Sequence, residues 1–215
     1  EVSLAHNGVL FLDEMPEFGH SVLEVLRQPL EDKHISIARA RYAVDYPSNF
    51  TLVASMNPCP CGYYNHPTKE CTCSAAAVHR YMGRISGPLM DRIDLHVEVT
   101  PVSREEMSVD TPAESSAEVR KRVIAARKIQ AERFKDTPVH TNTMMTSAML
   151  RRFCQLSAEA RTLLDRAMER LQLSARAYDR IIKVARTIAD LDGAEQIAPQ
   201  HISEAIGYRS LDRER

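Results

Sequence analysis

The feature that most constrains the fold is the apolar run Val9–Leu12, which passes without a break into two adjacent acids, Asp13 and Glu14. A short apolar run that follows a glycine is typical of a strand buried on both faces of a parallel sheet. Open α/β sheets bind their ligands at the carboxyl ends of the strands, where both acids fall. Side chains alternate along a strand, so we expect the two carboxylates to point to different sides. The sequence thus predicts an α/β domain with a ligand site at this edge.

An apolar run followed by Asp13 and Glu14 is the Walker B pattern of P-loop NTPases. In that setting one carboxylate holds a hydrated magnesium ion on a nucleotide, and the other polarises a water molecule. A strand that simply ends in polar residues would look the same, because a motif this short also arises by chance. Of the two interpretations, we favour the nucleotide site.

A second predicted strand, Phe50–Ser55, leads to Asn57. An asparagine at the end of a strand beside the Walker B strand can orient the attacking water and contact the γ-phosphate, the role called sensor 1. Alternatively, Asn57 opens a turn before Pro58, which is common for asparagine. The presence of Asp13 and Glu14 upstream favours the sensor role.

Further helices and strands complete the first hundred residues. We expect a helix over Phe18–Leu30 that Pro29 brings to its end, because proline cannot continue a helix. Apolar and polar residues then alternate on the two arms of a β-hairpin over Glu31–Pro47. A short helix, Ala75–Met82, and a third strand, Ile93–Val99, follow.

The second half of the chain changes character. Prolines and a Ser/Glu-rich stretch predict a linker over 101–114, between an α/β domain over 1–100 and an all-helical domain over 115–215. The predicted helices are Ala113–Phe134, Thr146–Cys154, Ala158–Leu171, Ala175–Leu191 and Pro199–Tyr208.

Helix ends are marked by residues with known end preferences. Ser157 and Ser174 are expected at N-caps, Gly193 at a C-cap, and Pro199 in a first turn.

The helix that starts near Ala113 is rich in lysine and arginine. It could present a basic face, but we favour an ordinary amphipathic helix whose charges lie in water. On that interpretation its apolar residues are buried: Val119, Val123, Ala126 and Ile129.

Composition argues against several classes of protein. A net charge of −1 over 215 residues gives no global basic field, so any nucleic-acid surface must be local. The lack of tryptophan argues against a stacking-rich module for single strands. No apolar run approaches the roughly 18 residues of a membrane helix, and we expect a cytoplasmic protein. Because the chain starts with Glu1 just before a central strand, we also expect a fragment or a processed chain.

Four of the five cysteines form two C-x-C pairs in one loop: Cys59, Cys61, Cys71 and Cys73. Four thiolates suit a tetrahedral structural zinc site, although such sites more often use C-x₂-C spacing. His66 is a spare ligand, and the fifth cysteine, Cys154, is expected in a core. The alternative is a set of reduced, metal-free cysteines in an ordered loop; we favour zinc.

Two arginines near the third strand, Arg84 and Arg92, are candidates for an arginine finger. Such a residue neutralises phosphate charge in the site of a neighbouring subunit. The alternative is a weak surface ion pair, Arg92 with Asp94 or Arg84 with Asp91.

Two further pairs of arginines could contact phosphates. Arg176 and Arg180 lie one turn apart and could reach a nucleotide from a lid, or form a solvated basic face. Arg39 and Arg41 flank the hairpin tip, where they could bind the phosphates of a polymer or only keep the tip soluble.

Five segments, taken in order, resemble the C-terminal portion of the ComM/YifB family, the magnesium-chelatase-like AAA+ ATPases. The resemblance implies a partial AAA+ P-loop NTPase core followed by an all-helical lid domain. The segments are AHNGVLFLDEMPEF, HISIARARYAVDYP, LVASMNPCPCGYY, RISGPLMDRIDLHVEV and LSARAYDRIIKVARTIADL.

The resemblance also implies roles for single residues. Asp13 and Glu14 are the Walker B pair, Asn57 is sensor 1, Arg92 is the arginine finger, and Arg176 is the sensor 2 arginine. Arg84 and Arg180 match the finger and sensor 2 positions less well. In related ring ATPases the hairpin before sensor 1 faces the central pore.

The chain departs from the family pattern because it lacks a P-loop, GxxGxGK[ST]. The glycine-rich turn and its lysine supply most of the grip on phosphates, so this chain should bind ATP weakly at best and should not hydrolyse it. For the parent protein, the resemblance implies a hexameric, Mg²⁺-dependent ATPase that acts on DNA in recombination or transformation. The alternatives are an ATPase that remodels a protein partner, as in magnesium chelatase, and a non-catalytic scaffold stabilised by zinc.

Overall fold

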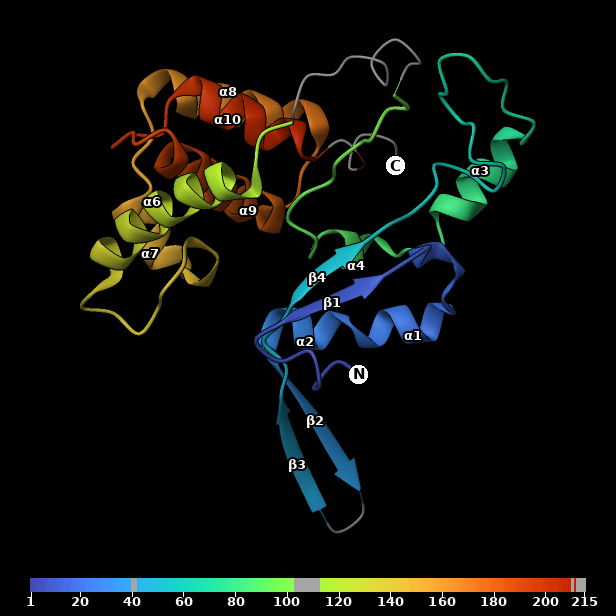
Figure 1. Cartoon of the computed structure of the whole chain (residues 1–215), viewed down its shortest axis with the longest axis horizontal. Coiled ribbons are helices and arrows are strands. Elements are labelled where there is room, and N and C mark those ends of the chain that lie inside the picture. The colour runs from blue at the N-terminus through green and yellow to red at the C-terminus, as the bar shows by residue number, and fades with distance from the viewer. Residues whose placement is uncertain (40–41, 103–112, 210, 212–215) are drawn as a thin grey trace. The chain divides into compact units, whose positions relative to one another are not determined.

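The computed structural model describes residues 1–39, 42–102, 113–209 and 211. These residues form two compact units, Glu1–Ile93 and Asp94–Arg215, which are described separately (Figure 1). Most of the predicted linker, residues 103–112, lies outside the described part of the chain. The first unit mixes helices and strands and the second is helical, as the sequence predicts.

The first unit is built on a parallel pair of strands, β1 (Val9–Leu12) and β4 (Thr51–Ala54). Their register pairs Val9 with Thr51 and Leu12 with Ala54. The amide of Ser55 donates to the carbonyl of Leu12 at 2.9 Å and extends the pairing past both strand ends. The two strands point the same way in Figure 1, so their carboxyl ends share one edge.

The helical segment between these strands is broken where the sequence predicts one helix. A 3-10 turn, η1 (Met15–Glu17), precedes α1 (His20–Val25) and α2 (Arg27–Asp32). The prediction that Pro29 ends the helix was wrong, because Pro29 lies inside α2. Proline lacks the N–H that would bond one turn back, so the break falls there, between α1 and α2.

The predicted hairpin is confirmed as β2 (His34–Arg39) and β3 (Tyr42–Pro47). The strands are antiparallel, with His34 opposite Pro47 and Arg39 opposite Tyr42. Across the pair, the Ser36 hydroxyl donates to Asp45 Oδ1 at 2.5 Å. The hairpin projects away from the β1–β4 pair (Figure 1).

The predicted third strand was wrong. After α3 (Ala75–Met82) and α4 (Gly87–Met90), the described residues 93–99 form neither helix nor strand. Leu95, Val97 and Val99 are 48%, 68% and 86% exposed. Their alternation has the period of a strand, but a strand needs a neighbouring strand along its whole length. Among the described residues the segment makes one backbone bond of this kind, from the His96 amide to the Tyr208 carbonyl at 2.7 Å, which is too little to form a ladder.

The second unit is a set of packed helices. Ser157 and Ser174 cap α8 and α9 as predicted, since each hydroxyl accepts the amide three residues on. Pro199 starts α10 as predicted, and Gly193, with φ of +67°, lies just past the C-cap of α9. The elements are α6 (Ser116–Phe134), η2 (Asn142–Met144), α7 (Ser147–Phe153), α8 (Ala158–Leu171), α9 (Ala175–Leu191) and α10 (Pro199–Gly207).

The prediction for the buried face of α6 was largely wrong. Ala126 is buried as predicted, but Val119, Val123 and Ile129 are 39%, 47% and 38% exposed. The helix packs against α9 through a stripe at four-residue spacing near its C-terminal end: Ala126, Gln130 and Phe134. Its first half has no such packing partner among the described residues, so the valines remain on the surface.

A buried polar network holds α6, η2 and α9 together. Asp190 accepts from Arg133 Nη1 at 2.7 Å, from Arg186 Nε at 3.1 Å and from Asn142 Nδ2 at 2.8 Å. Arg186 is 1% exposed and also donates to the Glu195 carbonyl at 2.6 Å. Buried charges persist only when they are paired and hydrogen-bonded, and this network meets that condition. In the described part of the chain, no helix has the length and apolar content needed to cross a membrane.

Candidate nucleotide and metal sites

Asp13 and Glu14 lie at the shared carboxyl edge of β1 and β4, as predicted. The hydroxyl of Ser55 donates to Asp13 Oδ1, and the Glu14 amide donates to the same Oδ1 and to Ser55 Oγ, each at 3.1 Å. Both of these bonds to Asp13 are accepted by Oδ1. Ser55 was missed by the sequence analysis, although the strand register places it opposite Asp13.

Glu14 departs from strand geometry. Its backbone has φ of 48° and ψ of 49°, in the left-handed region that residues with a Cβ rarely adopt. The amide of the next residue, Met15, donates to the Ser55 carbonyl at 2.9 Å and anchors the turn. We expected Asp13 and Glu14 to point to different sides because side chains alternate along a strand. That rule does not apply here, since β1 ends at Leu12. Strained backbone of this kind clusters at functional sites.

Asn57 lies exposed two residues beyond Ser55, where the cysteine loop begins. Its backbone hydrogen-bonds to Tyr81, a residue of α3 that is 5% exposed. Burial raises the pKa of Tyr81, and the charge of Glu17 adds to that rise. Glu14 and Asn57 are both among the groups that influence the pKa of Tyr81. The sequence analysis did not single out Tyr81.

The two finger candidates, Arg84 and Arg92, have different surroundings. Arg92 is an ion-pair partner of Glu31 and donates to the Pro88 carbonyl at 2.6 Å, and its side chain is 8% exposed. Arg84 contacts Glu17 at 2.8 Å, and its side chain is 49% exposed. The structure thus pairs both arginines with acids other than those weighed from the sequence. The hollow around Arg92, about 330 Å³, is lined mainly by charged side chains of α1 and α2.

The lid candidates belong to the second unit. Arg180 forms an ion pair with Asp94 of the same unit, while Arg176 lies on an exposed part of α9. Burial lowers the pKa of the neighbouring Lys183, whose Nζ donates to the Thr143 carbonyl at 2.9 Å. Lys183 is thus held against η2 and does not extend the solvated basic face considered for Arg176 and Arg180.

The DNA candidates fall at the edge of what the structure describes. Arg39 is the last residue of β2, and Arg41 lies outside the described residues.

The four loop cysteines converge as predicted. Their sulfur atoms all lie within 4.8 Å of one another, and this group could hold a metal ion. His66 does not join it; its Nδ1 instead accepts the amides of Thr68 and Lys69 at 3.2 and 3.1 Å. The fifth cysteine, Cys154, lies in the core of the second unit as expected, and burial raises its pKa to about 11.

The thiols of the loop differ in acidity. A hydrogen bond from the backbone of Tyr63 is the largest influence on Cys61 and lowers its pKa to about 5. Burial raises the pKa of Cys73. Around Cys71 a backbone hydrogen bond from Cys73 acts downward, but burial and the bonds from its fellow cysteines outweigh it and raise the pKa to about 12. Cys61 is thus a stronger acid than Cys71 and Cys73.

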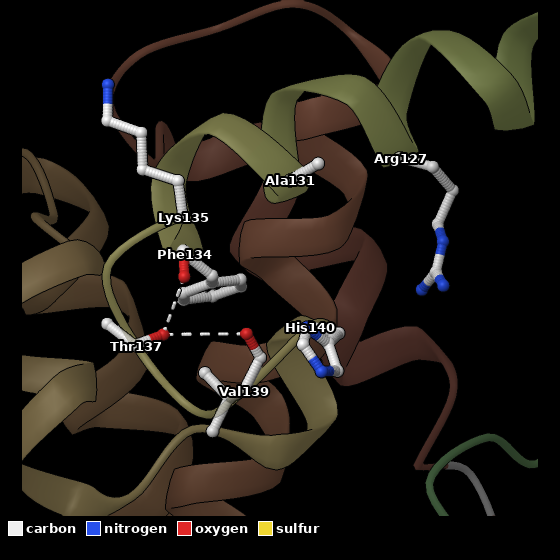
Figure 2. Close-up of a pocket in the computed structure, with 7 residues that line it drawn as sticks. All are labelled: Arg127, Ala131, Phe134, Lys135, Thr137, Val139 and His140. Carbon is white, nitrogen blue, oxygen red and sulfur yellow. Dashed lines mark hydrogen bonds between the residues drawn. The ribbon is translucent and has the colours of Figure 1, made fainter.

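A second hollow, about 380 Å³, lies in the helical unit beside the end of α6 (Figure 2). Its rim carries Arg127, Lys135 and His140. Thr137 braces it, since its hydroxyl donates to the carbonyls of Phe134 at 2.9 Å and Val139 at 3.4 Å. Its lining contains no carboxylate and no thiol.

Two family models match the chain. Residues 1–107 match the family model described as magnesium chelatase, subunit ChlI, and residues 113–209 match the model of its C-terminal region.

Curated relatives match along the whole chain. "Uncharacterized protein YifB" of Escherichia coli K12 and "Competence protein ComM" of Haemophilus influenzae Rd are each 44% identical over 214 residues, which is 99% of this chain and 41% of theirs. An uncharacterized protein of Mycobacterium tuberculosis H37Rv is 40% identical over 214 residues, all of this chain and 42% of its own length. The chain therefore spans about two fifths of the length of these relatives.

Together, the family models and the relatives account for nearly every residue of both units. Members of the matched family are AAA+ ATPases and commonly assemble as rings. The chain belongs to the ComM/YifB group of magnesium-chelatase-like proteins.

Proposed function

We propose that the chain is the C-terminal part of a Mg²⁺-dependent AAA+ ATPase, completed by a P-loop elsewhere in the parent protein, that acts on DNA in the cytoplasm. The observation that carries the proposal is the shared edge of β1 and β4. There Asp13, Glu14 and Ser55 are joined by hydrogen bonds and Asn57 follows directly. Ligands of open α/β sheets bind at this edge.

The residues at this edge fit the chemistry of ATP hydrolysis. Asp13 offers a carboxylate oxygen to Mg²⁺, a hard cation that prefers oxygen ligands. Ser55 orients that carboxylate through its hydroxyl. Glu14 polarises the attacking water, and Asn57 orients it against the γ-phosphate. When bound, Mg²⁺ would neutralise charge on the phosphates.

A ring supplies the remaining parts of the site. Arg92 serves as the arginine finger for the neighbouring subunit, and Arg176 contacts the nucleotide from the lid. For Arg92 this requires exchange of its ion pair with Glu31, an acid that is 45% exposed and so accessible to competition. Arg84, which is more exposed, is the second candidate for the finger. The family's tendency to form rings supports a hexamer.

DNA is the substrate we favour. One relative is named a competence protein, which supports a role in recombination or transformation. The hairpin of β2 and β3 projects from the β1–β4 pair, and Arg39 is the last residue of β2 (Figure 1). Arg41 follows two positions later in the sequence, and arginines at these positions could bind phosphates. The second candidate is an ATPase that remodels a protein, supported by the magnesium chelatase family model. A non-catalytic scaffold stabilised by zinc is the third.

The test is the steady-state ATPase rate of the full-length parent, with and without single-stranded DNA. We expect severalfold stimulation by DNA, and loss of that stimulation when Arg39 and Arg41 are both changed to Ala. Glu14→Gln should abolish turnover while ATP still binds, because only water activation is lost.

Each outcome separates the candidates. A rate indifferent to DNA would favour a protein substrate. Turnover unaffected by Glu14→Gln would contradict the assignment of this edge and favour a scaffold role for this part of the parent protein. Mixing Arg92→Ala subunits with Glu14→Gln subunits should restore part of the activity, since some interfaces then combine an intact finger with an intact site.

A further inference from the structure

The four loop cysteines are arranged as ligands of one central ion. Cys59 Sγ lies 3.4 Å from Cys61 Sγ and 3.7 Å from Cys71 Sγ, and the last two are 3.6 Å apart. With Zn–S bonds of about 2.3 Å, the sulfurs of a tetrahedral site lie roughly 3.8 Å from one another. The observed triangle is already close to that spacing, and Cys73 completes the group within 4.8 Å.

We propose that Cys59, Cys61, Cys71 and Cys73 bind one structural Zn²⁺, and that this zinc-held loop positions Asn57 for its role in ATP hydrolysis. The second half of the proposal rests on the function proposed above; the first half does not. Zinc replaces the thiol protons: one Zn²⁺ and four thiols give a tetrathiolate complex of charge −2 and release four protons.

The arrangement does not suit disulfides. A disulfide joins sulfurs in pairs about 2.0 Å apart, whereas Cys59, Cys61 and Cys71 form a triangle of nearly equal sides. In a triangle no pair is favoured over the others. A single ion at the centre contacts every sulfur at once, and four thiolate ligands favour a soft or borderline metal such as zinc.

Apart from the cysteine group, short-range contacts hold the loop, such as those of the Thr68 and Lys69 amides with His66 Nδ1. Residues 58–73 contain no helix or strand and are mostly exposed. Their internal contacts include two turns, in which the amides of Gly62 and His66 donate to the carbonyls of Cys59 at 3.0 Å and Tyr63 at 3.1 Å. Cys59, which is fully buried, is the exception. An ion that ties both ends of such a loop removes most of its conformational freedom.

The start of this loop is the candidate sensor. Asn57 precedes Cys59 by two residues. Gly62, with φ of +80°, curves back so that a Cβ added there would lie 4.0 Å from Asn57 Oδ1. The loop therefore returns to the side chain that is to orient the attacking water, and the metal site determines how closely it does so.

The end of the loop returns to the same residue. After Cys73, the Ser74 hydroxyl accepts the Ala77 amide at 3.3 Å and caps α3. That helix carries Tyr81, which hydrogen-bonds to the backbone of Asn57. The chain thus leaves Asn57, passes through the four cysteines and comes back to Asn57 through α3. Loss of zinc would free both supports of the sensor together.

The first experiment measures metal in the full-length protein purified without added zinc. We expect one zinc ion per chain, released when a mercurial reagent blocks the thiols, and almost none in a Cys59→Ser, Cys61→Ser double variant. Cys154→Ala is the matched control and should keep its zinc, since Cys154 belongs to the other unit. A metal-free protein, or one whose zinc survives the double variant, would overturn the site.

The second experiment tests the link to Asn57. Tyr81→Phe removes one hydrogen bond but none of the sulfurs, so zinc content should stay unchanged. We expect kcat for ATP to fall about fivefold, the equivalent of one ordinary hydrogen bond, with little change in KM. The cysteine double variant should lower kcat by roughly tenfold or more, as loss of supporting groups does at other sites.

The outcomes distinguish the two proposals. If zinc is present and both variants keep the parental kcat, the positioning role is overturned while the metal site stands. If the parent binds zinc but hydrolyses no ATP, the proposed function fails instead. If Tyr81→Phe raises KM and leaves kcat intact, α3 supports substrate binding, and the positioning of Asn57 is likewise overturned.

Discussion

The two units bury their apolar residues to different degrees. In the helical unit, α8, α9 and α10 enclose a continuous core in which Leu164, Ile181 and Ile202 are at most 1% exposed. In the first unit, one face of the β1–β4 pair remains open, with Val9 and Phe11 62% and 58% exposed. A helix bonds its own backbone, but a strand depends on neighbours. The comparison teaches that the helices cover one another's apolar faces, whereas the β1–β4 pair leaves apolar side chains exposed among the described residues.

Separating the units gives the largest expected effect. Residues 94–215 alone should unfold cooperatively in urea, because their core does not use the first unit. Residues 1–93 alone should show no cooperative transition and should bind a dye for exposed apolar surface. Calorimetry would measure whether each fragment unfolds cooperatively, and dye fluorescence would measure its exposed apolar surface. Cooperative unfolding of residues 1–93 would remove the contrast.

A matched pair of phenylalanines sharpens the comparison. Phe134 is 2% exposed in the helical core and Phe11 is 58% exposed on the open face of the sheet. Phe134→Ala should lower the free energy of unfolding by about 3 to 5 kcal/mol. Phe11→Ala should cost much less in this chain and more in the full-length protein, where further chain can cover the face. Equal costs of Phe11→Ala in the two lengths would contradict this.

The polar network of the helical unit gives a third test. Asp190→Ala leaves the buried Arg186 and the mostly buried Arg133 without their shared partner, and it should cost roughly 3 to 5 kcal/mol. Glu132→Ala is the control: it removes an acid from an exposed pair with Lys135, and the urea midpoint should hardly move. Similar shifts for both variants would mean that burial does not govern these pairs.

The smallest expected effect concerns two helix caps. Ser157→Ala removes the cap of α8, a helix packed in the core, and should cost about 1 kcal/mol. Ser115→Ala removes the cap of α6, whose first half is poorly packed and can fray. Its effect on the midpoint of unfolding should therefore be smaller. The reverse order would indicate that the start of α6 is held more firmly than its exposure suggests.

Features set by local sequence could be predicted well. The bounds of α8 and α9 agree with prediction, because capping serines and apolar periodicity act within a few residues. The third strand and the buried face of α6 could not be predicted, because both depend on which other segments pack against them. Pro29 has no N–H to bond the carbonyl one turn back. The helix therefore breaks before the proline and not at it.

The candidate site follows the same division. The positions of Asp13 and Glu14 at a strand end and the convergence of the four cysteines could be read from spacing. Ser55 required the register of β1 against β4, and Tyr81 required knowledge of where α3 returns. The charge partner of Arg92, an acid of α2, is 61 residues away in sequence and carries no local signal.

The left-handed backbone of Glu14 opposes the stability of the fold to the proposed activity. Glycine adopts this conformation freely, so Glu14→Gly would relieve strain on the order of 1 kcal/mol while removing the carboxylate proposed to activate water. Selection for stability alone would favour losing that glutamate. A glutamate retained in a strained turn is what the proposed role in water activation predicts.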